Sequence, residues 1–179
     1  YQLNQVADLF AKGLKSDMIH AMALTDYLTG LYNRTAFAEH KKLFYNAMIE
    51  QQLPIGVIQF DVNNLKYMND SFGHEKGDEL IKLTAEGLKN SFQRFGRCYR
   101  MGGDEFLVVL TGNDPEADYR LGIRLLHSYC EDINQTNMSD FSFEVAHGFV
   151  LSKGQVLEDV IKEADGKICL LYTADAADE

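Results

Sequence analysis

A Gly-Gly pair at residues 102 and 103 constrains this chain more than any other sequence feature. Apolar, β-prone segments precede it at 99–101 and follow it at 106–110. Because glycine adopts positive φ angles without steric cost, the pattern predicts a tight β-hairpin. Asp104 and Glu105 follow the pair at once, which places two carboxylates at a rigid edge of a sheet. They form either a solvated acidic tip or half of a divalent-metal site, since hard cations prefer oxygen ligands.

The composition of the 179-residue chain limits its class and its partners. It is 46% hydrophobic and 25% charged, with a formal net charge of -10. This length suits one globular core, and the acidic balance argues against nucleic acid or anionic membranes, which require basic patches. Cys98, Cys130 and Cys169 contain no CxxC pair and predict free thiols in a reducing compartment. Without a membrane-length apolar run or a signal-peptide pattern, we expect a cytoplasmic domain, or the cytoplasmic part of a membrane-anchored sensor protein, with no direct membrane contact of its own.

Hydrophobic periodicity predicts an α+β domain. We expect helices over the first two dozen residues, from about 35 to 50, after residue 78, from Pro115 and over 157–171. Strands are predicted at 55–62, in the hairpin and at 141–151, and the acidic tail from 173 is expected to fray. This order indicates an antiparallel sheet with helices packed on it.

The first predicted helix carries apolar residues at helical spacing: Leu3, Val6, Phe10, Leu14, Met18 and Met22. Such a stripe either packs on the main domain or pairs with a copy of itself. The sequence leaves both possibilities open.

Several polar residues have structural interpretations of their own. Asp61 interrupts an apolar strand near its end, and burying a carboxylate there is costly unless a partner such as a metal pairs with it. Asp78 precedes an amphipathic helix, so we expect it to be a helix N-cap, and we expect Asn69 in a turn. Asp26 and Arg34 are close enough in sequence to pair across a turn, and we interpret that pair as structural.

Three stretches taken together resemble the GGDEF family of diguanylate cyclases. Residues 26–34 resemble the opening signature of that domain, and residues 61–78 resemble its metal and guanine segment. Residues 102–106, Gly-Gly-Asp-Glu-Phe, match the motif that names the family. The resemblance implies a nucleotidyl-cyclase-like fold with a ferredoxin-like core, in which helices flank a five-stranded, mainly antiparallel sheet. It divides the chain into an N-terminal signalling or linker helix, 1–24, and a GGDEF domain, 25–179.

The resemblance also implies an activity. Two GTP molecules, one on each of two apposed domains, condense to cyclic di-GMP with release of two pyrophosphates. Two Mg²⁺ or Mn²⁺ ions per half-site would neutralise the triphosphate and lower the pKa of the attacking hydroxyl. The implied partners are GTP, a second copy of the domain and an upstream sensor domain, with no role for nucleic acid.

The site residues that the resemblance implies fall into three groups. Metal ligands are the carboxylates of Asp61 and Asp104 with the carbonyl of Val62, and the catalytic acids are Asp104 and Glu105. The remaining group binds substrate, with an amide and a carboxylate suited to the hydrogen-bonding groups of guanine: Asn69, Asp78, Lys66, Gly102 and Gly103.

Departures from the family pattern leave a second function open. Asn63 replaces the second acid of an Asp-x-Asp strand end, while Gln93 and Gly96 replace the charged residues of a product-inhibition motif. Tyr172 and Ala176 stand where the family has a lysine and an arginine that hold the triphosphate. The alternative is therefore a catalytically weak or inactive GGDEF domain that binds GTP or serves as a regulatory interaction module.

Overall fold

A four-stranded antiparallel sheet organises the computed structural model, which describes residues 2–136, 143–152 and 154–175. The strands lie in the order β2-β3-β1-β4. In chain order the elements are α1 (Gln2–Ala23), α2 (Arg34–Tyr45), the π-helical turn η1 (Asn46–Glu50), β1 (Ile55–Val62), α3 (Leu65–Phe72), α4 (His74–Phe92), β2 (Gly96–Gly102), β3 (Glu105–Leu110), α5 (Pro115–Thr136), β4 (Val145–Ser152) and α6 (Leu157–Asp175).

The central strand is β1, as its nearly continuous apolar sequence predicts. It pairs with β3 on one side and with β4 on the other. Asp61, near its end, lies opposite Glu105 of β3 and Ala146 of β4. The predicted strand at 55–62 and the predicted hairpin are both confirmed.

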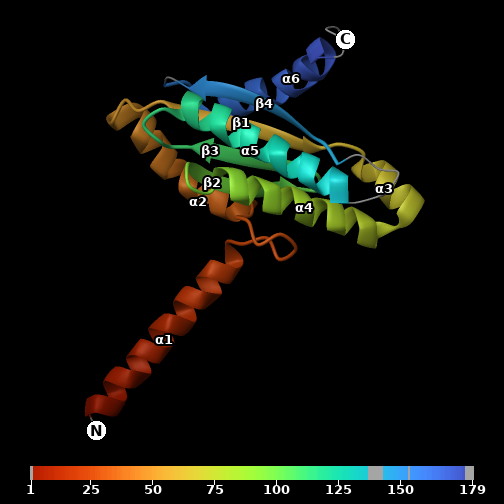
Figure 1. Cartoon of the computed structure of the whole chain (residues 1–179). Helices are drawn as coiled ribbons and strands as arrows, with labels where there is room; N and C mark the ends of the chain where they lie inside the picture. The colour runs from red at the N-terminus through yellow and green to blue at the C-terminus, as the bar shows by residue number, and fades with distance from the viewer. Residues whose placement is uncertain (1, 137–142, 153, 176–179) are drawn as a thin grey trace.

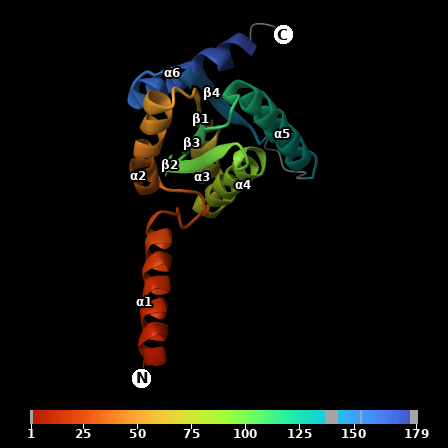
Figure 2. The same ribbon diagram turned by 90° about the vertical axis from the view of Figure 1, so that its left-hand side faces the viewer.

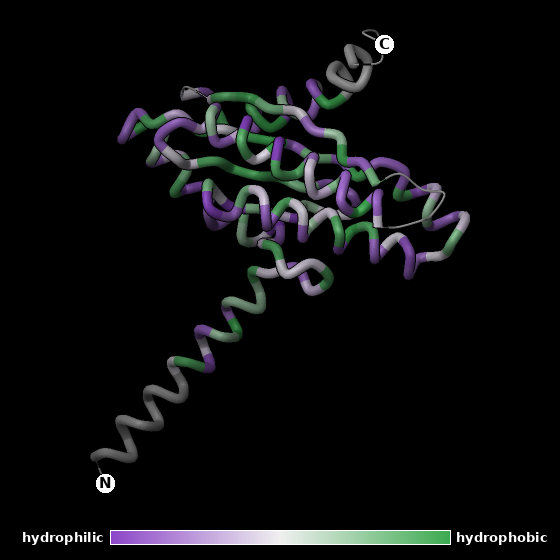
Figure 3. The backbone as a smooth tube through the Cα atoms, in the orientation of Figure 1, coloured by the Kyte–Doolittle hydropathy of each residue, from purple (hydrophilic) through white to green (hydrophobic). Residues whose placement is uncertain are grey.

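Helices cover both faces of the sheet. α4 and α5 lie on one face, and α2 and α6 lie on the other (Figures 1 and 2). The hydropathy colouring of Figure 3 shows apolar strands between helices that carry polar residues. Ile58, Phe60 and Val62 belong to the core beneath α4 and α5, whereas Val57 belongs to the core beneath α2 and α6. Because side chains alternate along a strand, Asp61 faces the α2 and α6 layer.

Some predicted elements differ from those observed. The described residues contain four strands rather than five. The strand expected at 141–151 is β4 at 145–152, and positions 141 and 142 lie outside the described residues, as do tail residues 176–179. The helix expected after residue 78 begins at His74, and α3 precedes it, so Asn69 lies in a helix rather than a turn.

The two helices α3 and α4 meet at a single residue, Gly73, whose φ of 87° favours glycine. Gly73, and not Asp78, is the N-cap of α4. By contrast, the Asn33 side chain caps α2 by accepting a hydrogen bond from the Ala36 amide at 3.0 Å.

α1 projects away from the rest of the domain (Figure 1). Its last turn approaches α2, where His20 Nε2 lies 3.5 Å from Glu39 Oε2. The described members of its predicted apolar stripe, Leu14, Met18 and Met22, are between 63% and 74% exposed, and Ile19 beside them is 59% exposed. Over the part of the chain that the structure describes, no helix is both long and apolar enough to cross a membrane. Cys98 and Cys130 are free thiols, as predicted, and the side chain of Cys169 is outside the description.

α6 packs directly on the backbone of β4 at Gly148. A Cβ atom at this residue would lie 2.1 Å from the Ala164 carbonyl oxygen of α6. We expect Gly148→Ala to lower the free energy of unfolding by about 1–3 kcal/mol, because backbone atoms must move to admit the methyl group. Thermal and urea unfolding of the variant would measure this loss.

Gly166→Ala in α6 is the matched control, because no described atom outside the backbone of its own helix lies within 4 Å of the position its Cβ would occupy. This change should be neutral or stabilising by up to about 1 kcal/mol, since alanine favours the helix. Equal stability of the two variants would contradict the close packing of α6 on β4.

Candidate active site

The turn between β2 and β3 carries the two acids that follow the Gly-Gly pair. Gly102 has φ 153° and Gly103 has φ 50°, so both residues occupy the region that favours glycine. The Val62 amide donates a hydrogen bond of 3.2 Å to the Asp104 carbonyl oxygen, which fixes the turn against the end of β1. The side chain of Asp104 is half-buried and that of Glu105 is exposed.

Carboxylates from three segments gather at this end of the sheet. Burial raises the pKa of Asp61, and the negative charges of Asp104, Glu105 and Asp165 raise it further. Asp165 belongs to α6, which covers the same face of the sheet as the Asp61 side chain. The structure therefore brings together the predicted carboxylates and adds Asp165, for which the sequence analysis assigned no role.

A guanidinium group holds the turn from the side of β2. Arg100 donates to the Gly103 carbonyl oxygen from Nε at 3.1 Å and from Nη2 at 2.9 Å. Its Nη1 donates to both carboxylate oxygens of Asp26, at 3.2 and 3.3 Å. The two side chains are only 12% and 17% exposed. We call Asp26, Arg100 and the Gly103 carbonyl the hairpin anchor.

The expected pairing of Asp26 with Arg34 is wrong. Asp26 pairs with Arg100 instead, and Arg34 Nε donates to the Met101 carbonyl oxygen at 2.9 Å. Burial acts to raise the pKa of Asp26, but hydrogen bonds from Thr29 and Arg100 together hold it below its ordinary value. Both members of the expected pair therefore contribute to holding the hairpin, through different partners.

The segment after α1 joins the sheet beside β2. The Tyr32 amide donates to the Cys98 carbonyl oxygen at 3.2 Å, and the Arg100 amide donates to the Tyr32 carbonyl oxygen at 2.8 Å. These bonds form a parallel bridge between Tyr32 and Tyr99. The chain that leaves α1 is thus bonded to the strand that leads into the Gly-Gly turn.

The two residues predicted to bind guanine meet at the junction of α3 and α4. A Cβ atom on Gly77 would lie 1.9 Å from Asn69 Oδ1, so the amide occupies space that a side chain at 77 would fill. Asp78 is the next residue and is exposed, as is Lys66 on α3. This arrangement makes the amide and the carboxylate neighbours, while their role in binding remains a prediction.

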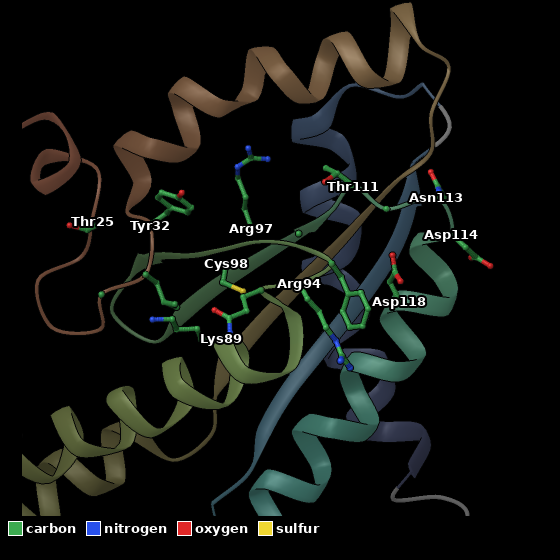
Figure 4. Close-up of a pocket in the computed structure, with 16 residues that line it drawn as sticks. Thr25, Tyr32, Lys89, Arg94, Arg97, Cys98, Thr111, Asn113, Asp114 and Asp118 are labelled. Atoms are coloured by element: carbon green, nitrogen blue, oxygen red, sulfur yellow. The ribbon is translucent and has the colours of Figure 1, made fainter. Parts of the chain in front are cut away.

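The cavity shown in Figure 4 lies at the opposite end of β2 from the carboxylates of Asp61, Asp104 and Glu105. It has a volume of about 990 Å³, and Gln93 and Gly96 are among its lining residues. In Figure 4, Arg97 points toward α2, whereas Arg94 points the other way. The Arg94 guanidinium stacks over the Phe95 ring at 4.6 Å from its centre. A Cβ atom on Gly96 would lie 2.0 Å from the Val109 carbonyl oxygen, so this position does not accept a side chain without movement.

The donor set at the end of β1 fits a hard divalent cation. Carboxylates and a backbone carbonyl are the ligands that Mg²⁺ and Mn²⁺ prefer. The raised pKa of Asp61 reflects its burial and also the negative charge of the acids around it, a charge that a cation would neutralise. Among the described side chains, no three His, Cys, Asp or Glu residues are placed to hold an ion by themselves. Magnesium commonly binds one or two carboxylates and completes its shell with substrate phosphates and water, which agrees with this arrangement.

Gln59 is a buried polar residue that the sequence analysis missed. It is 7% exposed, and its Oε1 has no hydrogen-bond partner within the described residues. It precedes Asp61 by two positions, so both side chains lie on the same face of β1. The sequence does carry a signal for it, because Gln59 is an amide within an otherwise apolar strand. Of the two departures in the C-terminal segment, Ala176 and the side chain of Tyr172 lie outside the described parts of the structure.

We expect Asp61→Asn to stabilise the metal-free domain at neutral pH. A carboxyl whose pKa is raised by folding contributes stability below its unfolded pKa of about 4, and this is lost as pH rises through the folded pKa. Removing the charge should raise the melting midpoint in EDTA by about 1–3 °C, a small effect because solvent screens a half-exposed group.

The same melting experiment with Mg²⁺ tests the metal site. The wild-type midpoint should rise when Mg²⁺ replaces EDTA, and the Asp61→Asn midpoint should not. The gain in EDTA should shrink below about pH 4, where the wild-type carboxyl is protonated. A lower midpoint for the variant in EDTA at neutral pH would contradict the crowding of carboxylates.

Comparisons with known proteins show which family this chain resembles. The family described as "Diguanylate cyclase, GGDEF domain" matches residues 23–175. Diguanylate cyclase VdcA of Vibrio cholerae is 31% identical over 183 residues, which cover 97% of this chain and 50% of that protein. Probable diguanylate cyclase DgcJ of Escherichia coli is 27% identical, covering 81% of this chain and 28% of that protein. The chain thus spans half or less of the length of these two relatives.

Solved structures share the fold. The coiled coil and GGDEF domain of DgcB from Caulobacter crescentus, in complex with c-di-GMP, superimposes with a TM-score of 0.81 at 19% identity. That likeness covers 97% of this chain and 93% of the other. A sensory box/GGDEF family protein of the same species has a TM-score of 0.67 at 27% identity, covering 86% and 99%. The family match, the fold and the acids at the Gly-Gly turn together establish that the chain belongs to the GGDEF domain family of diguanylate cyclases.

Proposed function

We propose that this domain condenses two GTP molecules into cyclic di-GMP and two pyrophosphates. The observation that carries the proposal is the meeting of Asp61, Asp104 and Glu105 at one end of the sheet, on a turn fixed by backbone hydrogen bonds. The relatives named as diguanylate cyclases support this reaction for the domain. In each half of the reaction, the 3′-hydroxyl of one GTP attacks the α-phosphorus of the other, and pyrophosphate leaves.

The carboxylates have distinct proposed roles. Asp61 and Asp104, with the Val62 carbonyl, would hold two Mg²⁺ or Mn²⁺ ions in each half-site. When bound, these ions neutralise phosphate charge and lower the pKa of the attacking hydroxyl. Glu105 is exposed beside them and, together with Asp104, is proposed to help remove the proton from the 3′-hydroxyl.

The junction of α3 and α4 is the proposed base site. Asn69 offers both a donor and an acceptor, and Asp78 accepts from the N1 and N2 hydrogens of guanine. Lys66 is exposed on the same helix as Asn69 and is assigned to the substrate phosphates. The backbone of Gly102 and Gly103 would allow the substrate to approach the turn closely, since neither residue has a side chain.

The second copy of the domain is the proposed partner during catalysis. Each site supplies one GTP, so two sites must face one another before either phosphodiester bond forms. The exposed stripe of Leu14, Met18 and Met22 on α1, with Ile19 beside it, is suited to pair with the same stripe of a second copy. We further propose a cytoplasmic domain that receives its signal through α1 from an upstream sensor domain, in line with the greater length of the relatives.

The proposed reaction is tested by incubating the domain with GTP and Mg²⁺ or Mn²⁺ and separating the products by chromatography. Cyclic di-GMP should form, and turnover per chain should rise with protein concentration because two half-sites must meet. We expect Asp104→Ala and Asp61→Ala each to reduce turnover by about a hundredfold or more while the fold persists, since metal-mediated charge stabilisation is lost.

Asp132→Ala, which removes an exposed carboxylate of α5, is the control and should retain full turnover. Wild-type turnover in either Asp61→Ala or Asp104→Ala would refute the assignment of the metal site. GTP binding without any product in the wild type would favour the second candidate, a GTP-binding or regulatory module. The observation behind that candidate is the presence of Tyr172 and Ala176 at the expected triphosphate positions.

We also propose that the domain lacks tight product inhibition at the start of β2. Gln93 and Gly96 give that cavity no charge where an arginine and an aspartate would be needed, and Arg94 and Arg97 point in different directions. Calorimetric titration of cyclic di-GMP should therefore show no micromolar binding by the wild type. Gln93→Arg should strengthen binding about tenfold by adding a charge-assisted contact.

The Gly96→Asp change is unsuited to this test because its Cβ would collide with the Val109 carbonyl. Micromolar binding by the wild type that disappears in Arg94→Ala or Arg97→Ala would overturn this proposal. In that case the neighbouring arginines would replace the missing charges.

A further inference from the structure

We propose that Arg34 binds the phosphate chain of the nucleotide at the carboxylate end of the sheet. This inference rests on the proposed GTP chemistry and adds a residue to the site. Neither the sequence motifs nor the metal site assigns Arg34 to the substrate. Its position, its unused hydrogen-bond donors and the local charge each support the assignment.

Arg34 lies at one end of a row of residues that crosses the sheet. Gly102 of β2 pairs with Glu105 of β3, and Glu105 pairs with Asp61 of β1. A Cβ atom on Gly102 would lie 3.8 Å from Arg34 Nη2, so the guanidinium covers the first residue of this row. Adjacent strands are about 4.8 Å apart, which puts Asp61 about 10 Å across the sheet from Gly102.

The guanidinium is held in place but keeps free donors. Arg34 Nε is used by the Met101 carbonyl, which fixes the head group beside the turn. Within the described residues, Nη1 and Nη2 form neither a hydrogen bond nor an ion pair, and the residue is exposed. Arg100 differs, because its nitrogens are engaged by Asp26 and by Gly103. A planar group with two free ends is suited to bidentate recognition of phosphate.

The charge balance of the site calls for such a cation. Asp61, Asp104, Glu105 and Asp165 already place negative charge where a triphosphate would bind. Lys162 and Lys167 are the only cations in the sequence of α6, Lys167 is paired with Glu163 at 3.2 Å, and residues 168–179 contain neither lysine nor arginine. Metal ions supply part of the compensation, and Arg34 supplies a fixed positive charge at the turn.

Calorimetry with a series of guanine nucleotides tests the inference. The ligands are GMP, GDP and a non-hydrolysable GTP analogue, each titrated with Mg²⁺ present. Arg34→Gln should weaken binding of the analogue by about tenfold or more, the size of a lost charge-assisted contact, and leave GMP within about twofold. Arg34→Lys should recover part of the loss, because it keeps the charge but not the bond from Nε to Met101.

Two further variants separate this role from others. Asp78→Asn should weaken all three ligands by a similar factor, because they share the guanine base. Lys42→Gln removes an exposed cation further along α2 and should change none of the affinities. The affinity of the wild type for the analogue should also fall with salt more steeply than that of Arg34→Gln.

Each outcome bears on the inference. A uniform loss for all three ligands in Arg34→Gln, together with a lower melting midpoint, would assign Arg34 a purely structural role and overturn the proposal. Unchanged affinities would overturn it as well, and in both cases the proposed cyclase function would stand. A wild type that binds none of the ligands would remove the proposed function, and the role of Arg34 with it.

Discussion

The geometry of the acidic turn depends on the ion pair between Arg100 and Asp26. Both side chains are largely buried, so water does not readily take the place of either partner when that partner is removed. Breaking such a pair typically costs about 3–5 kcal/mol because an unpaired charge stays behind. The same guanidinium holds the Gly103 carbonyl, so the pair fixes backbone as well as charge. The position of Asp104, one residue later, is thus set by a contact with the segment that follows α1.

The carboxylate end of the sheet keeps its structure although its acidic side chains repel one another. Asp61 is drawn toward protonation by burial and by three neighbouring acids, a cost that the apolar remainder of β1 offsets. Ile55, Val57, Ile58 and Phe60 are fully buried and bind the strand into both core layers. Functional sites often concentrate such unfavourable charge, because a bound cation then relieves the repulsion between the carboxylates.

The sequence predicted the elements whose signals are local. The strand 55–62 follows from an uninterrupted apolar run, and the hairpin follows from glycine between two β-prone segments. The N-cap of α4 was misplaced because α3 is short and a single glycine separates the two helices. Local pattern also favoured pairing Asp26 with Arg34, eight residues away, over Arg100, 74 residues away. Contacts across such separations are set by strand register and helix packing, which periodicity does not report.

Two of the departures from the family pattern, Gln93 and Gly96, lie at the opposite end of β2 from the intact motif. Gln93 and Gly96 border β2 where it begins, while Gly102 ends it at the carboxylates, a separation of about 20 Å for a strand of seven residues. Gly96 packs against the backbone of β3, so position 96 itself is closed to a side chain, whereas no described atom outside the adjoining residues lies within 4 Å of a Cβ on Gly103. β2 is bonded to β3 along its length and to Tyr32 at its outer edge. Because these bonds hold the strand independently of the side chains in the cavity, charge can be lost at one end while the carboxylates at the other keep their arrangement.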